Sequence, residues 1–348
     1  MAWKKILFSR AFGVGILALC TAFTLYCAAG RQTAVPTDAR TQSAAQQTQP
    51  LPAPDPQPAP PAPAPEPEPE PEPEPAVTLP AERVETGTAG ANAPSDGGWQ
   101  GASDEELLAF LEELAALPHY KRVRAPRYLN YYGSHWTNEQ ILRIVNTDND
   151  LLPFEQAWNA DVGRGSLILA NKYHYLDRYE PPELVQLSAR YGTWGALQRE
   201  AYDAFVAMVD AAEAAGYRIQ TSSPYRSYAI QRDLYAAYAD RNGAARADTY
   251  SARAGYSEHQ LGLAVDVCQV GGYYGAFGST PDAGWVNEHA HEYGFILRYG
   301  EDMTYITGYI YEPWHFRYVG PDAAAYIRDN GLTYEEYYYY YVAGDETR

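Results

Sequence analysis

Hydrophobic residues recur at helical spacing in several stretches that follow residue 103. The stretch 107–117 is amphipathic, and Ser103 stands before it as an expected N-terminal cap. Thr137 precedes a second apolar stretch of this kind, so another helix is expected to begin there. Gly216 and Gly331 follow two further stretches and are typical helix ends. The remaining predicted helices cover 197–215, 227–241, 285–293 and 321–330.

Shorter apolar runs predict β-strands. Residues 217–221 alternate between apolar and polar side chains, which is the period of a strand with one buried face. Other strand-like segments are 166–170, 262–267, 294–299, 305–311 and 316–319. Because helical patterns come mostly first and strand patterns mostly later, we expect an α+β fold in which helices pack on a small antiparallel sheet.

The first thirty residues form a separate segment. Lys4, Lys5 and Arg10 precede an uncharged run, 11–30, that is long enough to cross a bilayer as a helix. The same run is compatible with a cleaved signal peptide, and Cys27 with a lipoprotein attachment, so three alternatives stay open. In all of them the positive flank predicts that the rest of the chain is exported.

A proline-rich segment follows, over residues 31–103. It holds 17 of the 26 prolines, many alternating with glutamate, and offers too little apolar material for a packed core. Alternating proline favours an extended chain of about 3 Å per residue, so we expect a spacer. We therefore predict a signal peptide or membrane anchor (1–30), a disordered linker (31–103) and one folded domain (104–348).

Net charge and cysteine content exclude several classes of protein. The formal charge is −18, and the part after the linker still carries −14, whereas a nucleic-acid-binding protein needs a basic face. After residue 30 there is one cysteine, Cys268, so an exported domain must depend on packing or a metal rather than on disulfides. The sequence indicates no nucleic-acid partner, no protein partner and no particular oligomeric state.

Two short segments concentrate residues that bind metal ions. His259 and Asp266 lie in 257–266, and His315 lies in 312–318. Two imidazoles and one carboxylate are a normal ligand set for a catalytic zinc ion with water in the fourth position. Asp266 stands inside the apolar run 263–267, where a carboxylate is costly unless it is paired or bound to a cation. Without further information, a histidine near an aspartate is more often a structural pair.

Glu312 precedes His315 by three residues, with Pro313 between them. The proline disfavours a helix, and an offset of three on a strand would put the two side chains on opposite faces. We therefore expect Glu312 at a turn before the strand, close enough to the metal to take a proton from water as a general base. His289 and His291 lie in a predicted helix and receive no role.

The sequence resembles the VanY-type D-alanyl-D-alanine carboxypeptidases, which are zinc peptidases of the bacterial cell wall. The pattern Ser-x-His-x-x-Gly-x-Ala-x-Asp occupies 257–266, and Glu-x-x-His occupies 312–315. Further matching segments are 171–184, 223–231, 251–266, 293–299 and 312–320. The resemblance implies a hedgehog/DD-peptidase-like α+β domain. One departure is Pro224, where the family often has glycine.

The resemblance also implies roles for individual residues. Zn²⁺ would be held by His259, Asp266 and His315. Glu312 would be the general base, and Arg226 would stabilise the oxyanion that forms from the scissile carbonyl. Ser257 and Gln231 would bind substrate or support the ligands.

The predicted function is hydrolysis of the terminal D-Ala from peptidoglycan stem peptides, outside the cytoplasm and at the cell wall. The protein would be secreted, or membrane-anchored if segment 11–30 is not cleaved. Two alternatives stay open. One is a cell-wall endopeptidase acting on L-Ala-D-Glu or a cross-link, and the other is a non-catalytic wall-binding module. The sequence does not distinguish D-Ala from D-Ser or D-lactate at the substrate terminus.

Overall fold

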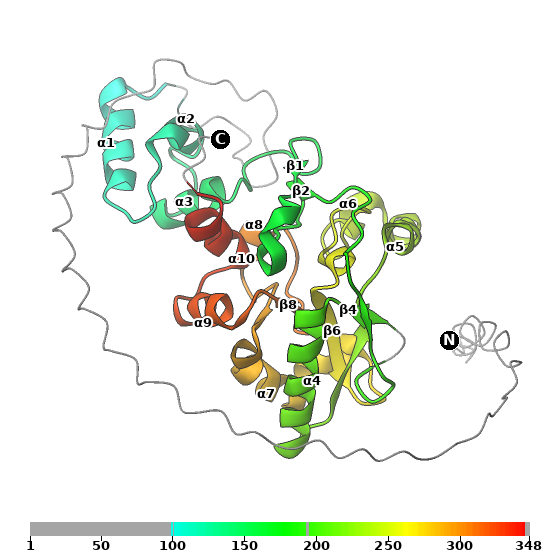
Figure 1. Ribbon diagram of the computed structural model, residues 1–348. Helices are drawn as coiled ribbons and strands as arrows, with labels where there is room; N and C mark the ends of the chain where they lie inside the picture. The colour runs from blue at the N-terminus through cyan, green and yellow to red at the C-terminus, as the bar shows by residue number, and fades with distance from the viewer. Residues whose placement is uncertain (1–98, 100, 193–194, 345–348) are drawn as a thin grey trace, which may run out of the picture. The chain divides into compact units, whose positions relative to one another are not determined.

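The computed structural model describes residues 99, 101–192 and 195–344 (Figure 1). These residues belong to one compact unit, Glu72–Arg348. The predicted signal or anchor segment, and all but the last few residues of the predicted linker, lie outside the described residues. Within the described part of the chain, none of the helices has the length and apolar character that crossing a membrane requires.

Helices and strands alternate irregularly along the chain. The α-helices are α1 (Asp104–Ala115), α2 (Ala125–Leu129), α3 (Asn138–Asn146), α4 (Arg199–Ala214), α5 (Tyr228–Asn242), α6 (Ala244–Ala247), α7 (Pro281–His289), α8 (Thr304–Thr307), α9 (Pro321–Asp329) and α10 (Tyr334–Tyr337). The strands are β1 (Trp158–Asn159), β2 (His174–Tyr175), β3 (Val185–Gln186), β4 (Ala196–Leu197), β5 (Ile219–Ser223), β6 (Ala264–Gln269), β7 (Phe295–Leu297) and β8 (His315–Tyr318). Short helical turns include η2 (Val162–Leu167), η3 (Glu258–Leu261) and η6 (Tyr338–Val342).

The predicted helix starts are set by local hydrogen bonds. Ser103 and Thr137 each accept a hydrogen bond from the third residue of their helix, α1 and α3, in reciprocal capping boxes. Ser227 caps α5 in the same manner without the reciprocal bond. Because such caps depend on neighbouring residues alone, the sequence predicted these helices to within about three residues.

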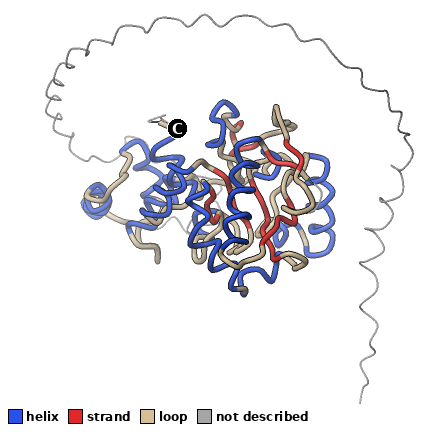
Figure 2. Tube along the Cα trace, turned by 60° about the horizontal axis from the view of Figure 1, so that its bottom comes forward, coloured by secondary structure: helices blue, strands red, loops and turns tan. Residues whose placement is uncertain are grey.

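A four-stranded antiparallel sheet lies at the centre of the fold, in the order β5-β6-β8-β7. Helices flank its strands (Figure 2). Two further pairs, β1 with β2 and β3 with β4, have only two residues in each strand. The predicted α+β fold with a small antiparallel sheet is confirmed.

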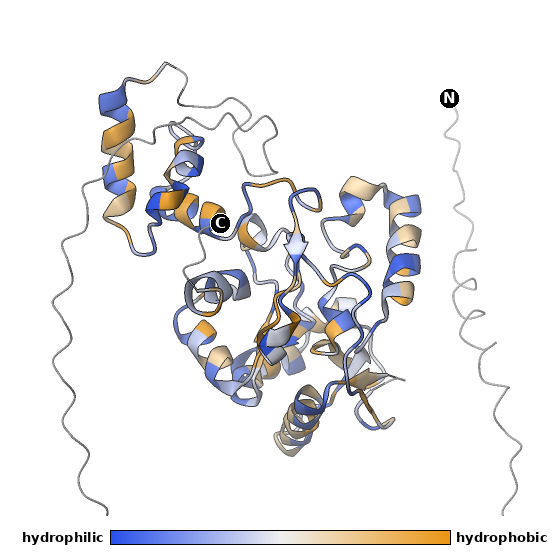
Figure 3. Ribbon diagram, turned by 45° about the horizontal axis from the view of Figure 1, so that its top comes forward, coloured by the Kyte–Doolittle hydropathy of each residue, from blue (hydrophilic) through white to orange (hydrophobic). Residues whose placement is uncertain are grey.

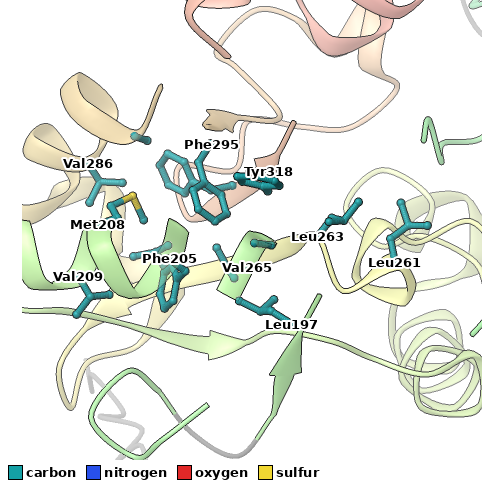
Figure 4. Close-up of a cluster of buried hydrophobic side chains, with 14 of the residues drawn as sticks. Leu197, Phe205, Met208, Val209, Leu261, Leu263, Val265, Val286, Phe295 and Tyr318 are labelled. Carbon is teal, nitrogen blue, oxygen red and sulfur yellow. The ribbon is translucent and has the colours of Figure 1, made fainter. Parts of the chain in front are cut away.

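Helix α4 packs its apolar stripe against this sheet. Phe205, Met208 and Val209 lie in one buried cluster with Val265 of β6 and Phe295 of β7 (Figure 4). The rings of Phe205 and Phe295 meet edge to face, with centroids 6.2 Å apart. Burial of these side chains fixes β6, the strand that carries Asp266, from behind.

Helices α1 to α3 form a second core. Leucines at 107, 111 and 114 give α1 one apolar side. Figure 3 shows both hydrophobic (orange) and hydrophilic (blue) residues along this helix. Arg143 of α3 joins this core to the C-terminal segment through an ion pair with Glu336, at 2.6 Å. Tyr338 and Tyr339 of that segment are buried in a further cluster of hydrophobic side chains.

Two predicted strands are wrong. Segment 166–170 begins inside the helical turn η2 and continues without strand pairing. The guanidinium of Arg317 donates to the carbonyl oxygens of Ser166 and Ile168, which a strand would use to bond its neighbour. Segment 305–311 begins as α8, which ends at Gly308 with φ of +73°, and the Gly308 carbonyl accepts a bond from Lys172 Nζ. In both places a distant cation satisfies the main chain.

Candidate active site

Strand register brings two of the three candidate ligands together. Asp266 of β6 stands directly opposite His315 of β8, and side chains of directly opposed residues share a face of the sheet. His259 comes from turn η3, just before β6. Gly262 lies between turn η3 and strand β6 and has a φ of +69°. A Cβ at this position would lie only 2.8 Å from the Leu184 side chain. Glycine is therefore required at this position.

The three side chains converge on one buried point. Asp266 Oδ1 lies 3.1 Å from His315 Nδ1 and 3.4 Å from His259 Nε2. One ligand atom from each residue lies within 4.8 Å of the other two. Ligands about 2.0–2.1 Å from a tetrahedral zinc ion are about 3.3 Å apart, so these spacings match a zinc site.

The hydrogen bonding of His259 supports a cation at this point. Its Nδ1 lies 2.7 Å from the main-chain carbonyl of Pro224, which can only accept, so Nδ1 carries the proton and Nε2 presents a lone pair. Nε2 is buried and has no hydrogen-bond partner among the described residues. It faces Asp266 Oδ1, another acceptor. Two acceptors buried face to face repel each other unless a cation lies between them.

The pKa values of the cluster indicate the same demand for positive charge. Burial, together with nearby Arg226, lowers the pKa of His259 to about 4, so this imidazole is neutral at pH 7. Burial alone would lower the pKa of His315, but hydrogen bonds to Asp266 and Glu258 raise it to about 9. A neutral imidazole and a carboxylate are the forms that bind a metal ion, and at His315 the metal would replace a proton.

A buried ion-pair network holds the far side of His315. Its Nε2 lies 3.5 Å from Glu258 Oε2, and the other oxygen of Glu258 accepts from Arg298 at 2.8 Å and Arg317 at 2.9 Å. Arg298 also donates two bonds to Glu335 of α10. All four network residues are at most 2% exposed, and two cations balance two carboxylates.

This network orients a candidate ligand. Burial alone would raise the pKa of Glu258, but Arg298 and Arg317 hold it well below its usual range, so Glu258 is an anion. An anion beside the second ring nitrogen fixes which nitrogen of His315 carries a proton and which one faces Asp266. Such carboxylate–histidine pairs tune the ligand strength of metal-binding histidines.

Glu312 and Arg226 flank the three candidate ligands. Glu312 Oε2 lies 3.9 Å from His315 Nδ1, close to the cluster but beyond hydrogen-bonding distance, in the irregular segment before β8. Burial raises the pKa of Glu312 to about 8. Arg226 follows β5, and its main-chain N–H donates to the carbonyl of His259. In the part of the chain that the structure describes, the buried Nε of Arg226 has no hydrogen-bond partner.

These residues open onto a cleft of about 330 Å³. The candidate ligands, Glu312, Arg226 and Ser257 all line it, as do several aromatic residues: Tyr238, Tyr273, Tyr274, Tyr299, Tyr309 and Trp314. Gln231 is not among the described lining residues. Its side-chain amide instead donates to the carbonyl of Ala252 and to Ser251 Oγ, so it supports the wall of the cleft from behind.

Comparisons with known proteins agree with these motifs. The family described as VanY, D-alanyl-D-alanine carboxypeptidase, matches residues 195–321. A D-alanyl-D-alanine carboxypeptidase of Enterococcus faecium is 34% identical over 238 residues, which cover 60% of this chain and 75% of that protein. The chain belongs to the VanY family.

Two further proteins are similar. YodJ of Bacillus subtilis (strain 168) is 42% identical over 186 residues, covering 49% of this chain and 66% of YodJ. The chain thus spans about two thirds of the length of YodJ. The other is a vancomycin resistance D,D-pentapeptidase, VanY, whose crystal structure is in complex with Zn(II). Its sequence is 36% identical, the match covers 49% of this chain and 98% of the VanY chain, and the TM-score is 0.44.

The VanY motifs contain most of the site, but not all of it. The sequence singled out every residue that faces the candidate metal, and it left His289 and His291 aside. His289 pairs with Glu292 on the surface. Glu258 and Tyr309 had no predicted role. Glu258 could have been inferred from Arg298 and Arg317, which stand in otherwise apolar segments, because buried arginines need a buried acid as partner.

Replacing Glu258 by glutamine should weaken zinc binding about 10- to 100-fold, because His315 loses the anion that orients it. The measurement is zinc affinity by competition with a chromophoric chelator. Glu292→Gln is the matched control, since it removes the carboxylate of a histidine pair that is exposed. Equal zinc affinities for the two variants would show that Glu258 does not orient a ligand.

Proposed function

We propose that this protein is a zinc-dependent D,D-carboxypeptidase that removes the terminal D-Ala from peptidoglycan stem peptides. The observation that carries the proposal is the buried Nε2 lone pair of His259 facing the Asp266 carboxylate at 3.4 Å, inside the VanY motif. His259, Asp266 and His315 would hold the zinc ion. Zinc would supply a Lewis acid that polarises the scissile carbonyl and the attacking water.

Glu312 is proposed as the general base and acid. It stands next to the ligands without reaching them, and burial raises its pKa to about 8. A zinc ion beside it would favour the ionised form, so that the carboxylate can accept a proton near neutral pH. Its carboxylate would take a proton from the attacking water. As the C–N bond breaks, the same proton would pass to the leaving nitrogen, which departs as the amine of D-alanine.

Arg226 is proposed to stabilise the negative charge that develops on the scissile carbonyl oxygen. Its main chain is bonded to His259, which holds it beside the cluster, and its buried Nε is free to donate into the cleft among the described residues. A fixed positive charge in a site of low dielectric stabilises an oxyanion strongly. Together with a bound zinc ion it would make the cleft locally positive in an acidic chain, which suits a substrate that ends in a carboxylate.

We propose an extracytoplasmic location. Support comes from the basic residues before the uncharged run 11–30 and from the proline- and glutamate-rich segment that follows it. An extended spacer of that composition would allow the catalytic domain to reach into the wall from an anchor.

The central test is incubation of the zinc-loaded protein with a synthetic pentapeptide ending in D-Ala-D-Ala. We expect release of one D-alanine, and in Glu312→Ala a kcat that is about 10²- to 10⁴-fold lower at unchanged zinc content. Glu301→Ala, at an exposed position, is the control. Normal turnover by Glu312→Ala would exclude its role as the base. Cleavage inside the stem or at a cross-link, seen by mass spectrometry of muropeptides, would favour an endopeptidase instead.

Metal content tests the ligand set separately. His315→Ala should bind much less than one zinc ion per chain, because it leaves only two ligands. His289→Ala, which removes a histidine that pairs with Glu292 at the surface, should keep the wild-type content. Elemental analysis after dialysis gives the answer, and full zinc occupancy in His315→Ala would refute the proposed site.

A further inference from the structure

The side chain of Tyr309 forms part of the cleft wall, and the proposed function gives it no role. The residue is 2% exposed and lines the cleft, and its hydroxyl is buried with no hydrogen-bond partner within the described ranges. A buried donor without an acceptor is unfavourable, and few are left so in folded proteins. A ligand that enters the cleft can satisfy it.

The ring of Tyr309 is held firmly. Lys172 Nζ lies 4.6 Å from the centroid of the Tyr309 ring, and the centroid of the Tyr299 ring lies 4.8 Å from it. Thr307 Oγ1 bonds both the main-chain N–H and the carbonyl of Tyr309. Tyr299 in turn packs on the ring of His315, with centroids 4.9 Å apart. The hydroxyl therefore keeps a fixed position relative to the candidate metal site, as a substrate-binding donor must.

The hydroxyl belongs to the Glu312 side of the cleft. Glu312 donates its main-chain N–H to the carbonyl of Tyr299, whose ring packs on that of Tyr309, and both Glu312 and Tyr309 line the cleft. Burial raises the pKa of Tyr309, so its hydroxyl stays protonated at neutral pH. In the proposed reaction Glu312 delivers its proton to the leaving nitrogen. A donor beside Glu312 therefore faces the terminal residue that leaves, rather than the part of the peptide that stays.

That terminal residue limits what the hydroxyl can recognise. D-alanine offers a nitrogen that is a donor in the peptide, a methyl group, and a carboxylate, so the carboxylate is its only hydrogen-bond acceptor. We propose that Tyr309 is a substrate-binding residue whose hydroxyl donates to the terminal carboxylate and so selects peptides with a free C-terminus. The inference rests on the proposed function.

Tyr309→Phe tests this directly, because it keeps the ring and its packing and removes only the hydroxyl. Loss of a hydrogen bond to a charged acceptor should raise KM for the pentapeptide about 10- to 100-fold, with kcat changed less than about threefold. Tyr131→Phe is the matched control: Tyr131 also has a buried hydroxyl without a partner among the described residues, but it lies in the core of α1 to α3. This control should keep the wild-type KM.

A second measurement does not depend on the fraction of folded protein. D-Ala-D-Ala and its C-terminal amide are compared as competitive inhibitors, and Tyr309→Phe should weaken inhibition by the acid about tenfold or more while affecting the amide less than about threefold. Equal effects on acid and amide, an unchanged KM, or a loss confined to kcat would each overturn the assignment. A wild-type protein that releases no D-alanine would overturn the proposed function and this inference together.

Discussion

The ionised carboxylate of Asp266 is the constraint on which the rest of this structure depends. It is 6% exposed within an apolar strand, and burial alone would raise its pKa, yet the positive charge of His315, 3.1 Å away, holds its pKa well below the usual range. A buried anion of this kind requires positive charge close by. The antiparallel register, the turn before β6 and the glycine between them all serve to bring nitrogen atoms to within 3.4 Å of one oxygen.

Charge alternates in sign outward from Asp266. His315 is followed by Glu258, then by Arg298 and Arg317, and finally by Glu335 on the last α-helix. Each member is buried, so each is tolerable only because its neighbour carries the opposite charge. The arrangement holds the candidate metal ligands rigidly on this side, whereas the side toward the cleft keeps unpartnered donors within the described part of the chain.

Local patterns made most of the fold predictable, and distant contacts explain what was missed. Helix caps and apolar spacing act over a few residues, so the longer helices and the central strands were predicted, whereas the short helices α2, α6, α8 and α10 were not. The segment 166–170 was mistaken for a strand because its carbonyls bond Arg317, about 150 residues away. The candidate ligands were recognisable because Asp266 is a carboxylate inside an apolar run. Glu258 and Tyr309 do not stand out in their own sequence segments. Only the folded structure shows that Arg298 and Arg317 surround Glu258, and that the Tyr309 hydroxyl has no hydrogen-bond partner among the described residues.

The ion pair between Arg298 and Glu335 has a consequence for how the protein assembles. The two residues are 37 positions apart, and Glu335 comes after all three candidate ligands in the chain. During synthesis or export from the N-terminus, His259, Asp266 and His315 emerge before the acid that neutralises Arg298. Until α10 arrives, the network carries an excess positive charge, which disfavours closing it around His315. The network around His315 is therefore complete only when Glu335 is in place, which couples the geometry of the candidate metal site to the docking of the last α-helix.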